Sequence, residues 1–248
     1  AYHVVLSSGD AGAALLDGFT ISGGNTDGEY SSILVNSFTI WKNNGGGMYN
    51  QFSSPVLTHV RLISNAALSG GGIFNWDSSS PVLTNVTLSR NAAQSGGGLH
   101  NSFSSPTIYN TILWGNTAMS GTDNNIYNDG SAPEFHHSLI EGSSWNSSWG
   151  INHTNNIVTD IDPFIGSDSE DYTLAATSAA IDAGNNTYYT DPDKGNGDLE
   201  NDLDLTGNPR VYDFANGGII DMGAYEYQGN PVPVIQPDAD NILYVDKS

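Results

Sequence analysis

Residues 45–65 read GGGMYNQFSSPVLTHVRLISN, residues 70–91 read GGGIFNWDSSSPVLTNVTLSRN, and residues 96–116 read GGGLHNSFSSPTIYNTILWGN. One motif is thus written three times, with a period of 25 and then 26 residues. A weaker fourth copy follows, in which Ile126-Tyr127-Asn128 replaces the glycine segment and Pro133-Glu134-Phe135 replaces the Ser-Ser-Pro segment. A fixed period in this range is the signature of stacked structural repeats.

Each copy has too few apolar residues to form a core by itself. The apolar residues alternate with polar ones over three to five positions, which predicts short strands separated by turns. If each copy formed one turn of a coil, equivalent strands would stack about 4.8 Å apart and bury one another's side chains. The sequence therefore predicts an all-β protein, a right-handed parallel β-helix. Its predicted inward columns are Met48/Ile73/Leu99/Ile126, Leu57/Leu83/Ile108/Phe135, Leu62/Leu88/Leu113/Ile140 and the less apolar Val60/Val86/Thr111/Ser138.

Two repeated residue types suit the corners of such a coil. The glycine triplets permit backbone angles with positive φ. The repeated asparagine, found as Asn65, Asn91 and Asn116, has a side chain that bonds to backbone groups and stacks on its equivalents in neighbouring coils.

The composition limits the classes of partner. The chain of 248 residues contains no cysteine, which excludes disulfides and thiolate metal sites. No run of 18 apolar residues is present, so we expect no membrane insertion. Lys and Arg total 6 against 27 Asp and Glu, a net charge of −21, and nucleic acid and anionic membranes are therefore unfavourable partners.

The pattern divides the chain into three predicted parts. Residues 1–159 form the coils, and residues 17–25 and 36–43 are further coil segments that place Phe19 and Phe38 in the Val60 column and Ile21 and Ile40 in the Leu62 column. Residues 143–157 are a long loop. Residues 160–228 form a C-terminal cap with an acidic loop. Residues 229–248 are a Pro-rich linker with a lone strand at 241–246, which either pairs head-to-tail with another molecule or a next domain, or ends in solvent.

Four segments also carry a family resemblance. LDGFTISGGN at 16–25, the glycine repeats, AIDAGNN at 180–186 and DLDLTGNPRVYD…DMGAYEYQ at 202–228 resemble large secreted bacterial β-helix proteins. Those proteins have repeats of the chlamydial polymorphic-outer-membrane-protein type and end in a choice-of-anchor Q module. The resemblance covers residues 14–228 and implies a secreted or cell-surface bacterial protein with a role in adhesion.

Catalytic residues are hard to assemble from the repeats. A polysaccharide lyase on this scaffold would need carboxylates beside an Arg or Lys, and a glycosidase would need two positioned carboxyl groups. The repeats contain only Arg61 and Arg90 as cations, and acids such as Asp77 and Asp129 are about two coils apart. We therefore expect a non-catalytic module with an adhesion or spacer role, and keep a polysaccharide-degrading enzyme as the alternative.

Aromatic residues predict a binding surface for a glycan or another cell-surface polymer. Residues that directly follow the Met48 column should point outward as one exposed ladder: Tyr49, Phe74, His100 and Tyr127. A second outward column should hold Trp41 and Trp114, with Ile63 and Glu141. Flat rings repeated along a groove suit the faces of sugars. The alternative is that the stacked rings only stabilise successive coils.

Two groups of residues are candidate metal ligands. The acidic loop offers hard oxygen ligands suited to Ca²⁺, namely Asp191, Asp193, Asp198, Glu200, Asp202 and Asp204. The second group is His136 and His137 with Glu134 and Glu141, of which at most one histidine joins any site, because neighbouring residues on a strand point to opposite faces. For both groups the alternative is a solvated surface.

Overall fold

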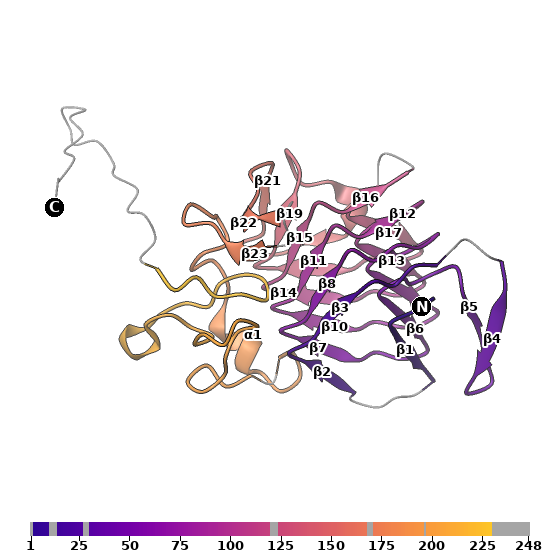
Figure 1. Cartoon of the computed structure of the whole chain (residues 1–248), viewed down its shortest axis with the longest axis horizontal. Coiled ribbons are helices and arrows are strands. Elements are labelled where there is room, and N and C mark those ends of the chain that lie inside the picture. Colours follow the sequence, from indigo (N-terminus) through magenta and orange to yellow (C-terminus); the bar gives the residue numbers. More distant parts are fainter. Residues whose placement is uncertain are drawn as a thin grey trace.

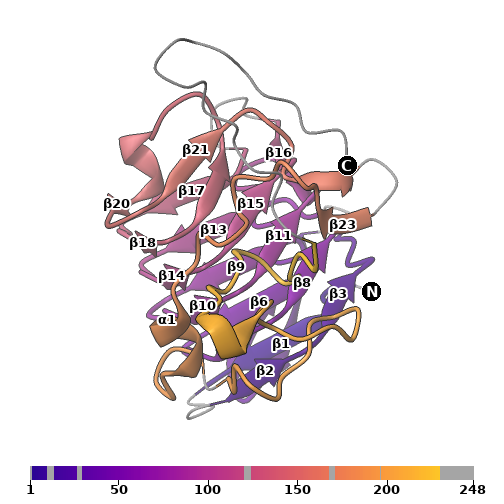
Figure 2. The ribbon, with the colours of Figure 1, turned by 90° about the vertical axis from the view of Figure 1, so that its left-hand side faces the viewer.

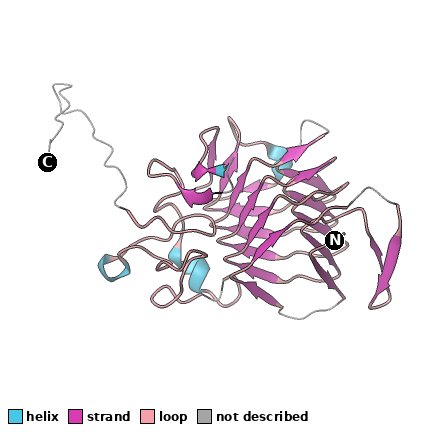
Figure 3. Cartoon of the chain, in the orientation of Figure 1, coloured by secondary structure: helices cyan, strands magenta, loops and turns pink. Residues whose placement is uncertain are grey.

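The computed structural model describes residues 2–9, 14–26, 30–119, 124–167, 171–195 and 197–229. The predicted strand at 241–246 and its head-to-tail pairing lie outside these residues. The described chain is built mainly of strands, with a few short helical turns (Figure 3).

Three parallel sheets form the body of the molecule, and the chain passes through them in turn (Figure 1). Sheet A contains β1 (Val5–Ser8), β6 (Met48–Gln51), β9 (Ile73–Trp76), β13 (Leu99–Ser102) and β17 (Ile126–Asp129). Sheet B contains β2 (Leu15–Asp17), β7 (Val56–Thr58), β10 (Val82–Thr84), β14 (Thr107–Tyr109), β18 (Glu134–His136) and β20 (Ile151–Asn152). Sheet C contains β3 (Thr20–Ser22), β8 (Arg61–Ile63), β11 (Thr87–Ser89), β15 (Ile112–Trp114), β19 (Leu139–Glu141) and β21 (Ile157–Thr159). The predicted parallel β-helix is confirmed.

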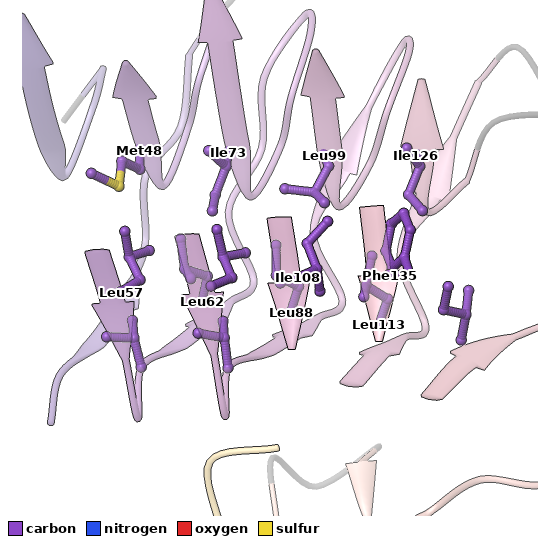
Figure 4. Packing of buried hydrophobic residues seen from close by; sticks show 14 of the residues in the cluster. Met48, Leu57, Leu62, Ile73, Leu88, Leu99, Ile108, Leu113, Ile126 and Phe135 are labelled. Atoms are coloured by element: carbon purple, nitrogen blue, oxygen red, sulfur yellow. The ribbon is translucent and has the colours of Figure 1, made fainter. Parts of the chain in front are cut away.

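The predicted inward columns form the core of the coil. Ile73 lies in register with Met48 and Leu99, Leu83 with Leu57 and Ile108, and Leu88 with Leu62 and Leu113. Figure 4 shows these side chains stacked between the strands, and they are at most 2% exposed. The less apolar column Val60/Val86/Thr111/Ser138 is also buried, and its hydroxyl groups accept hydrogen bonds from the backbone of the neighbouring coil. Thr111 Oγ1 accepts from the Val86 amide at 3.3 Å, and Ser138 Oγ accepts from the Thr111 amide at 3.2 Å.

Asparagine side chains form two amide ladders, of which the sequence predicted the one at a corner of the coil, and the other lies within the strands of sheet A. Asn65 Nδ2 donates to Asn91 Oδ1 at 3.1 Å, Asn91 Nδ2 donates to Asn116 Oδ1 at 3.1 Å, and Asn116 Nδ2 donates to Asn125 Oδ1 at 2.9 Å. A second ladder runs through Asn50, Asn75, Asn101 and Asn128, with spacings of 2.8, 2.8 and 2.9 Å. Apart from Asn116, whose partner Asn125 directly precedes β17, each donor bonds to its equivalent one coil away, which fixes the register of the stack.

The corners of the coil require glycine for two reasons, the backbone conformation and the lack of room for a side chain. Gly70 has a φ of +64°, a conformation that favours glycine. A Cβ atom on Gly71 would lie 2.5 Å from the Ala92 carbonyl oxygen of the next coil. The corner therefore brings successive backbones closer than any side chain would allow.

The prediction of an extra coil at residues 36–43 is wrong. The chain instead forms an antiparallel hairpin of β4 (Ser32–Val35) and β5 (Phe38–Trp41), inserted into one corner of the coil. Its turn residues Asn36 and Ser37 have φ of 51° and 69°, the signs found in a two-residue hairpin turn. The predicted position of Ile21 opposite Leu62 is confirmed, whereas Phe19 is 54% exposed and does not fill the Val60 column.

The hairpin leaves and rejoins the coil at a defined point. The Thr26 hydroxyl donates to the Asn43 carbonyl at 3.0 Å, while Asn25 and Asn44 form parallel bridges with Ala66 and Ser69 of the next coil. The coil path is therefore continuous across the insertion.

The predicted loop at 143–157 is partly wrong, because it returns to the coil. It contains a 3₁₀ turn, η1 (Ser147–Trp149), and then β20, which pairs with β18. Trp149 is buried in the main core, and Trp145 packs against that core. These two tryptophans cover the interior where the regular repeat ends.

The described residues between 160 and 229 lie along the side of the coil (Figure 2). They contain the antiparallel pair β22 (Phe164–Gly166) and β23 (Asp171–Leu174), the helix α1 (Asn186–Thr190) and the 3₁₀ turn η3 (Phe214–Asn216). We call this segment the lateral cover. It bonds to successive coils at the turn between sheets B and C: Asn85 Nδ2 donates to the Asp221 carbonyl at 2.7 Å, and Asn110 Nδ2 donates to the Asn185 carbonyl at 3.0 Å. The predicted domain boundary at residues 159/160 stays a prediction.

Candidate functional sites

The predicted aromatic ladder on sheet A exists, but most of it is covered. Tyr49, Phe74, His100 and Tyr127 are in register, with ring centroids 5.2, 4.9 and 4.7 Å apart. Tyr49 is 0%, Phe74 2% and His100 9% exposed, so the prediction of an exposed ladder is wrong. The reason is the β4–β5 hairpin, whose Val35, Phe38 and Ile40 pack in one cluster with Tyr49 and Phe74.

Burial shifts the pKa values of two side chains in this ladder. It lowers the pKa of His100 to about 4 and raises the pKa of Tyr49 to about 12. Both side chains are therefore neutral near pH 7, as a packed aromatic column requires.

The second outward column is covered as well. Ile63 and Trp114, on sheet C, are 4% and 7% exposed and pack with Phe164, Tyr172 and Met222 of the lateral cover. Trp114 is thus part of a core, and its predicted exposure is wrong.

The two cations of the repeats also contact the lateral cover. Arg61 Nη1 donates to the Tyr225 hydroxyl, and the Arg61 guanidinium lies 5.4 Å from the ring centre of Tyr172. Arg90 Nη1 donates to the Ser167 carbonyl at 2.6 Å. Both arginines therefore attach the lateral cover to the coil.

Trp41 is the one residue of the predicted ligand-binding set that is more than a third exposed, at 43%. It lies at the end of β5, outside the predicted column, and lines a shallow groove of about 330 Å³. The groove is bounded by three aromatic residues and a polar edge: Tyr30, Trp41, Trp76, Asn43, Asn44, Ser69 and Leu68. We call it the Trp41 groove.

An amide side chain at this groove has an unused acceptor. Asn43 is 4% exposed, and within the described part of the chain its Oδ1 atom has no hydrogen-bond partner. A buried acceptor without a partner is costly, at about 1–3 kcal/mol. The Oδ1 atom is itself shielded from solvent, so a ligand would reach it only after the Asn43 side chain turned towards the groove.

The acidic loop uses its carboxylates mainly for internal bonds. Asp191 Oδ2 is 2.7 Å from Lys194 Nζ, Asp202 accepts from the Tyr189 hydroxyl at 3.0 Å, and Asp204 accepts from the amides of Thr206 and Asn208 at 2.8 and 3.0 Å. Across the described residues, no three of the six predicted ligands bring carboxylate oxygens within 4.8 Å of one another. Calcium binding by this loop stays a prediction.

A different group does converge on the outer face of sheet B. Ligand atoms of Glu134, His136 and His153 all lie within 4.8 Å of one another. Glu134 and His136 belong to the predicted histidine cluster, whereas His137 and Glu141 of that cluster do not join them. The sequence did not predict that His153 belongs to this group, because residues 143–157 were expected to form a loop. The strand β20, which directly precedes His153, was therefore not predicted.

Aromatic side chains surround this group. Tyr109, one coil before His136, stacks on it with ring centroids 5.0 Å apart, and Tyr188 of α1 lies 4.3 Å from Tyr109. Lys194 Nζ lies 5.5 Å from the ring centre of Tyr188. The lateral cover thus contributes one side of this surface, a placement that the repeat pattern does not predict.

Comparison of the chain with protein-family models, curated proteins and solved structures gives no match. None of the helices in the described ranges is both long and apolar enough to cross a bilayer.

Proposed function

We propose that this chain is a non-catalytic β-helix module of a secreted or cell-surface bacterial protein, and that it binds glycans at the Trp41 groove. The observation that carries the proposal is the groove itself, in which the exposed rings of Trp41 and Tyr30 line the same opening as Trp76 and the polar residues Asn44 and Ser69. The resemblance of the repeats and of the segment 180–228 to secreted bacterial β-helix proteins supports the location and the adhesion role.

The chemistry of the groove suits a sugar. Sugar rings present C–H faces that stack on aromatic side chains, and hydroxyls that donate to amide oxygens. Trp41 is 43% and Tyr30 78% exposed, so their rings are accessible from solvent. The opening is shallow, which suits one or two units of a long polymer better than an enclosed small molecule.

The coil supplies rigidity to this site. Trp76 stacks on Phe74 with ring centroids 5.8 Å apart, and Phe74 belongs to the covered ladder of sheet A. Trp41 ends the hairpin strand that covers this ladder. One wall of the groove is therefore fixed to the repeat, and the opposite wall to the insertion.

A glycan array followed by titration with each bound saccharide tests the proposal. We expect weak binding that Trp41→Ala and Tyr30→Ala each reduce at least about tenfold, as for loss of an aromatic contact at a binding site. Phe19→Ala is the matched control, because the exposure of Phe19, 54%, lies between those of Trp41 and Tyr30, and Phe19 does not line the groove.

The same samples distinguish binding from catalysis. Saccharides that bind are incubated with the protein and examined for unsaturated or shortened products, and we expect none. Product formation would support a polysaccharide-degrading enzyme in place of the proposed module. Binding that survives both groove substitutions would reject the Trp41 groove, and absence of any bound glycan would reject the glycan role.

A further inference from the structure

The cluster of Glu134, His136 and His153 spans two consecutive coils. Glu134 and His136 are two residues apart on β18, so their side chains leave the same, outer face of sheet B. Phe135 is in register with Asn152, which places His153 directly beside His136. The rings of the two histidines are parallel, with centroids 4.2 Å apart and planes at 5°.

The backbone around the cluster is held by strand hydrogen bonds. The His153 amide donates to the Phe135 carbonyl at 3.0 Å, and the Ile151 amide donates to the Pro133 carbonyl at 2.8 Å. Tyr109 packs against the His136 ring from the preceding coil. The positions of the ligand atoms are therefore set by the coil stack.

The distances are close to those of a metal site. Glu134 Oε2 lies 3.4 Å from His153 Nε2 and 3.9 Å from His136 Nε2. Ligand atoms around a tetrahedral Zn²⁺ with bonds of about 2.0–2.1 Å are about 3.3 Å apart. Because the lone pair of each imidazole nitrogen lies in its ring plane, the two histidine rings would have to rotate out of their parallel stack for all three atoms to reach a shared ion.

The cluster is open to solvent on its outer side. His153 and Glu134 side chains are 38% and 46% exposed, so an ion has access from solvent.

We propose that Glu134, His136 and His153 bind one divalent transition-metal ion, with Zn²⁺ as the preferred ion and an open fourth position for water. Two imidazole nitrogens and one carboxylate form a donor set suited to zinc. The ion would join β18 to the residue that follows β20, and would thereby fasten the last coil of sheet B. This site is independent of the Trp41 groove and of the proposed glycan binding.

His137 provides a matched control beside the site. Its ring points away from the cluster, with Nδ1 3.2 Å from the Ala183 carbonyl oxygen and Nε2 3.3 Å from Asn155 Nδ2. His137 has a φ of 45°, a conformation that asparagine tolerates. His137→Asn therefore removes an imidazole while leaving the three ligands in place.

The test is a titration of the whole chain with Zn²⁺ in the presence of excess Ca²⁺. Calcium occupies carboxylates that attract cations through the net charge of −21, and competes poorly for imidazole. We expect one Zn²⁺ per chain by calorimetry and a rise in melting temperature, because the ion binds only the folded state. We expect His153→Gln and Glu134→Gln each to weaken this binding at least about tenfold, and His137→Asn to leave it unchanged.

Co²⁺ serves as a spectroscopic probe of the same site. Intense visible absorption bands that His153→Gln removes would support a low-coordinate site with nitrogen ligands. The proposal is overturned if the wild-type chain binds no Zn²⁺ under these conditions, or if both ligand substitutions leave the affinity unchanged. It is also overturned if His137→Asn weakens binding as much as His153→Gln does. Circular dichroism of the metal-free variants verifies that they fold. Because the His153 and Glu134 side chains are both partly exposed, either substitution can be used if the other one prevents folding.

Discussion

The two faces of a single strand, β9, are buried for different reasons. Ile73 points inward and is 0% exposed because identical positions of neighbouring coils, Met48 and Leu99, cover it. Phe74 points outward and is 2% exposed because the β4–β5 hairpin, which is not part of the repeat, packs over it. The repeat thus builds its own interior, but insertions and the lateral cover decide which outer faces meet solvent.

The largest expected effect tests the covered outer face. Phe74→Ala should lower the free energy of unfolding by about 3–5 kcal/mol, as for other buried Phe side chains. Denaturant unfolding followed by circular dichroism measures the change. A loss within about 0.5 kcal/mol, as expected for an exposed residue, would show that the hairpin does not cover this face in solution.

The inner face should respond through the stack. Leu88→Ala removes a side chain that is 0% exposed and in register with Leu62 and Leu113, and should cost about 2–5 kcal/mol. The same unfolding measurement applies. A cost of less than about half a kcal/mol would contradict the register of sheet C.

The asparagine ladder offers a polar version of this test. Asn91 Oδ1 accepts from both the backbone amide and the side-chain amide of Asn65, each at 3.1 Å. Asn91→Ala removes the acceptor of the buried Asn65 backbone amide and leaves Asn65 Nδ2 with only its bond to the Ile21 carbonyl at 3.0 Å, and should cost about 1–3 kcal/mol. If Asn91→Ala is as stable as the wild type, the ladder contributes nothing to the stack.

The pH dependence of stability separates the lateral cover from the coil. Burial raises the pKa of Asp221 to about 7 and that of Glu226 to about 8, with the Asp221 charge adding to the shift of Glu226 and Arg210 opposing both. Because the folded state holds these protons more tightly than the unfolded state, stability falls as the pH rises from the ordinary carboxyl values through about 7 to 8.

The buried histidines of the coil make folding stability depend on pH in the opposite direction. Burial lowers the pKa of His100 to about 4, and burial, followed by Arg210, lowers that of His59 to about 4. The unfolded chain binds these protons first, so their contribution is lost as the pH falls from about 6.5 towards about 4. Above about pH 7 an unfolded histidine is also mostly neutral, so the carboxyl pair dominates the pH dependence there.

We therefore expect the free energy of unfolding to decrease between about pH 7 and 8, by on the order of 1 kcal/mol. Glu226→Gln should flatten this slope. Glutamine can accept only one of the two hydrogen bonds that Glu226 accepts from the Tyr212 and Asp221 amides, so the substitution also lowers stability at every pH. The quantity to compare is therefore the slope of stability against pH. An unchanged slope in Glu226→Gln would show that the carboxyl pair does not titrate in this range.

The amino-acid sequence by itself determined the coil. The periods of 25 and 26 residues, the inward columns and the Asn65 ladder are all local regularities, and each copy repeats the same pattern of strand, turn and glycine corner. Stacking then follows, because only an identical neighbour satisfies each apolar side chain and each amide.

Only the tertiary structure decided what lies outside the coil. The hairpin at 32–41 and the lateral cover have no repeat partner, so no pattern in the sequence shows that they bury Phe74 and Trp114. The same holds for the open surfaces. His153 lies beside His136 only because the chain returns to sheet B after Trp149, and the Trp41 groove exists only where an insertion meets the end of β9. Contacts between segments far apart in sequence depend on packing of non-equivalent side chains, which a one-dimensional period does not encode.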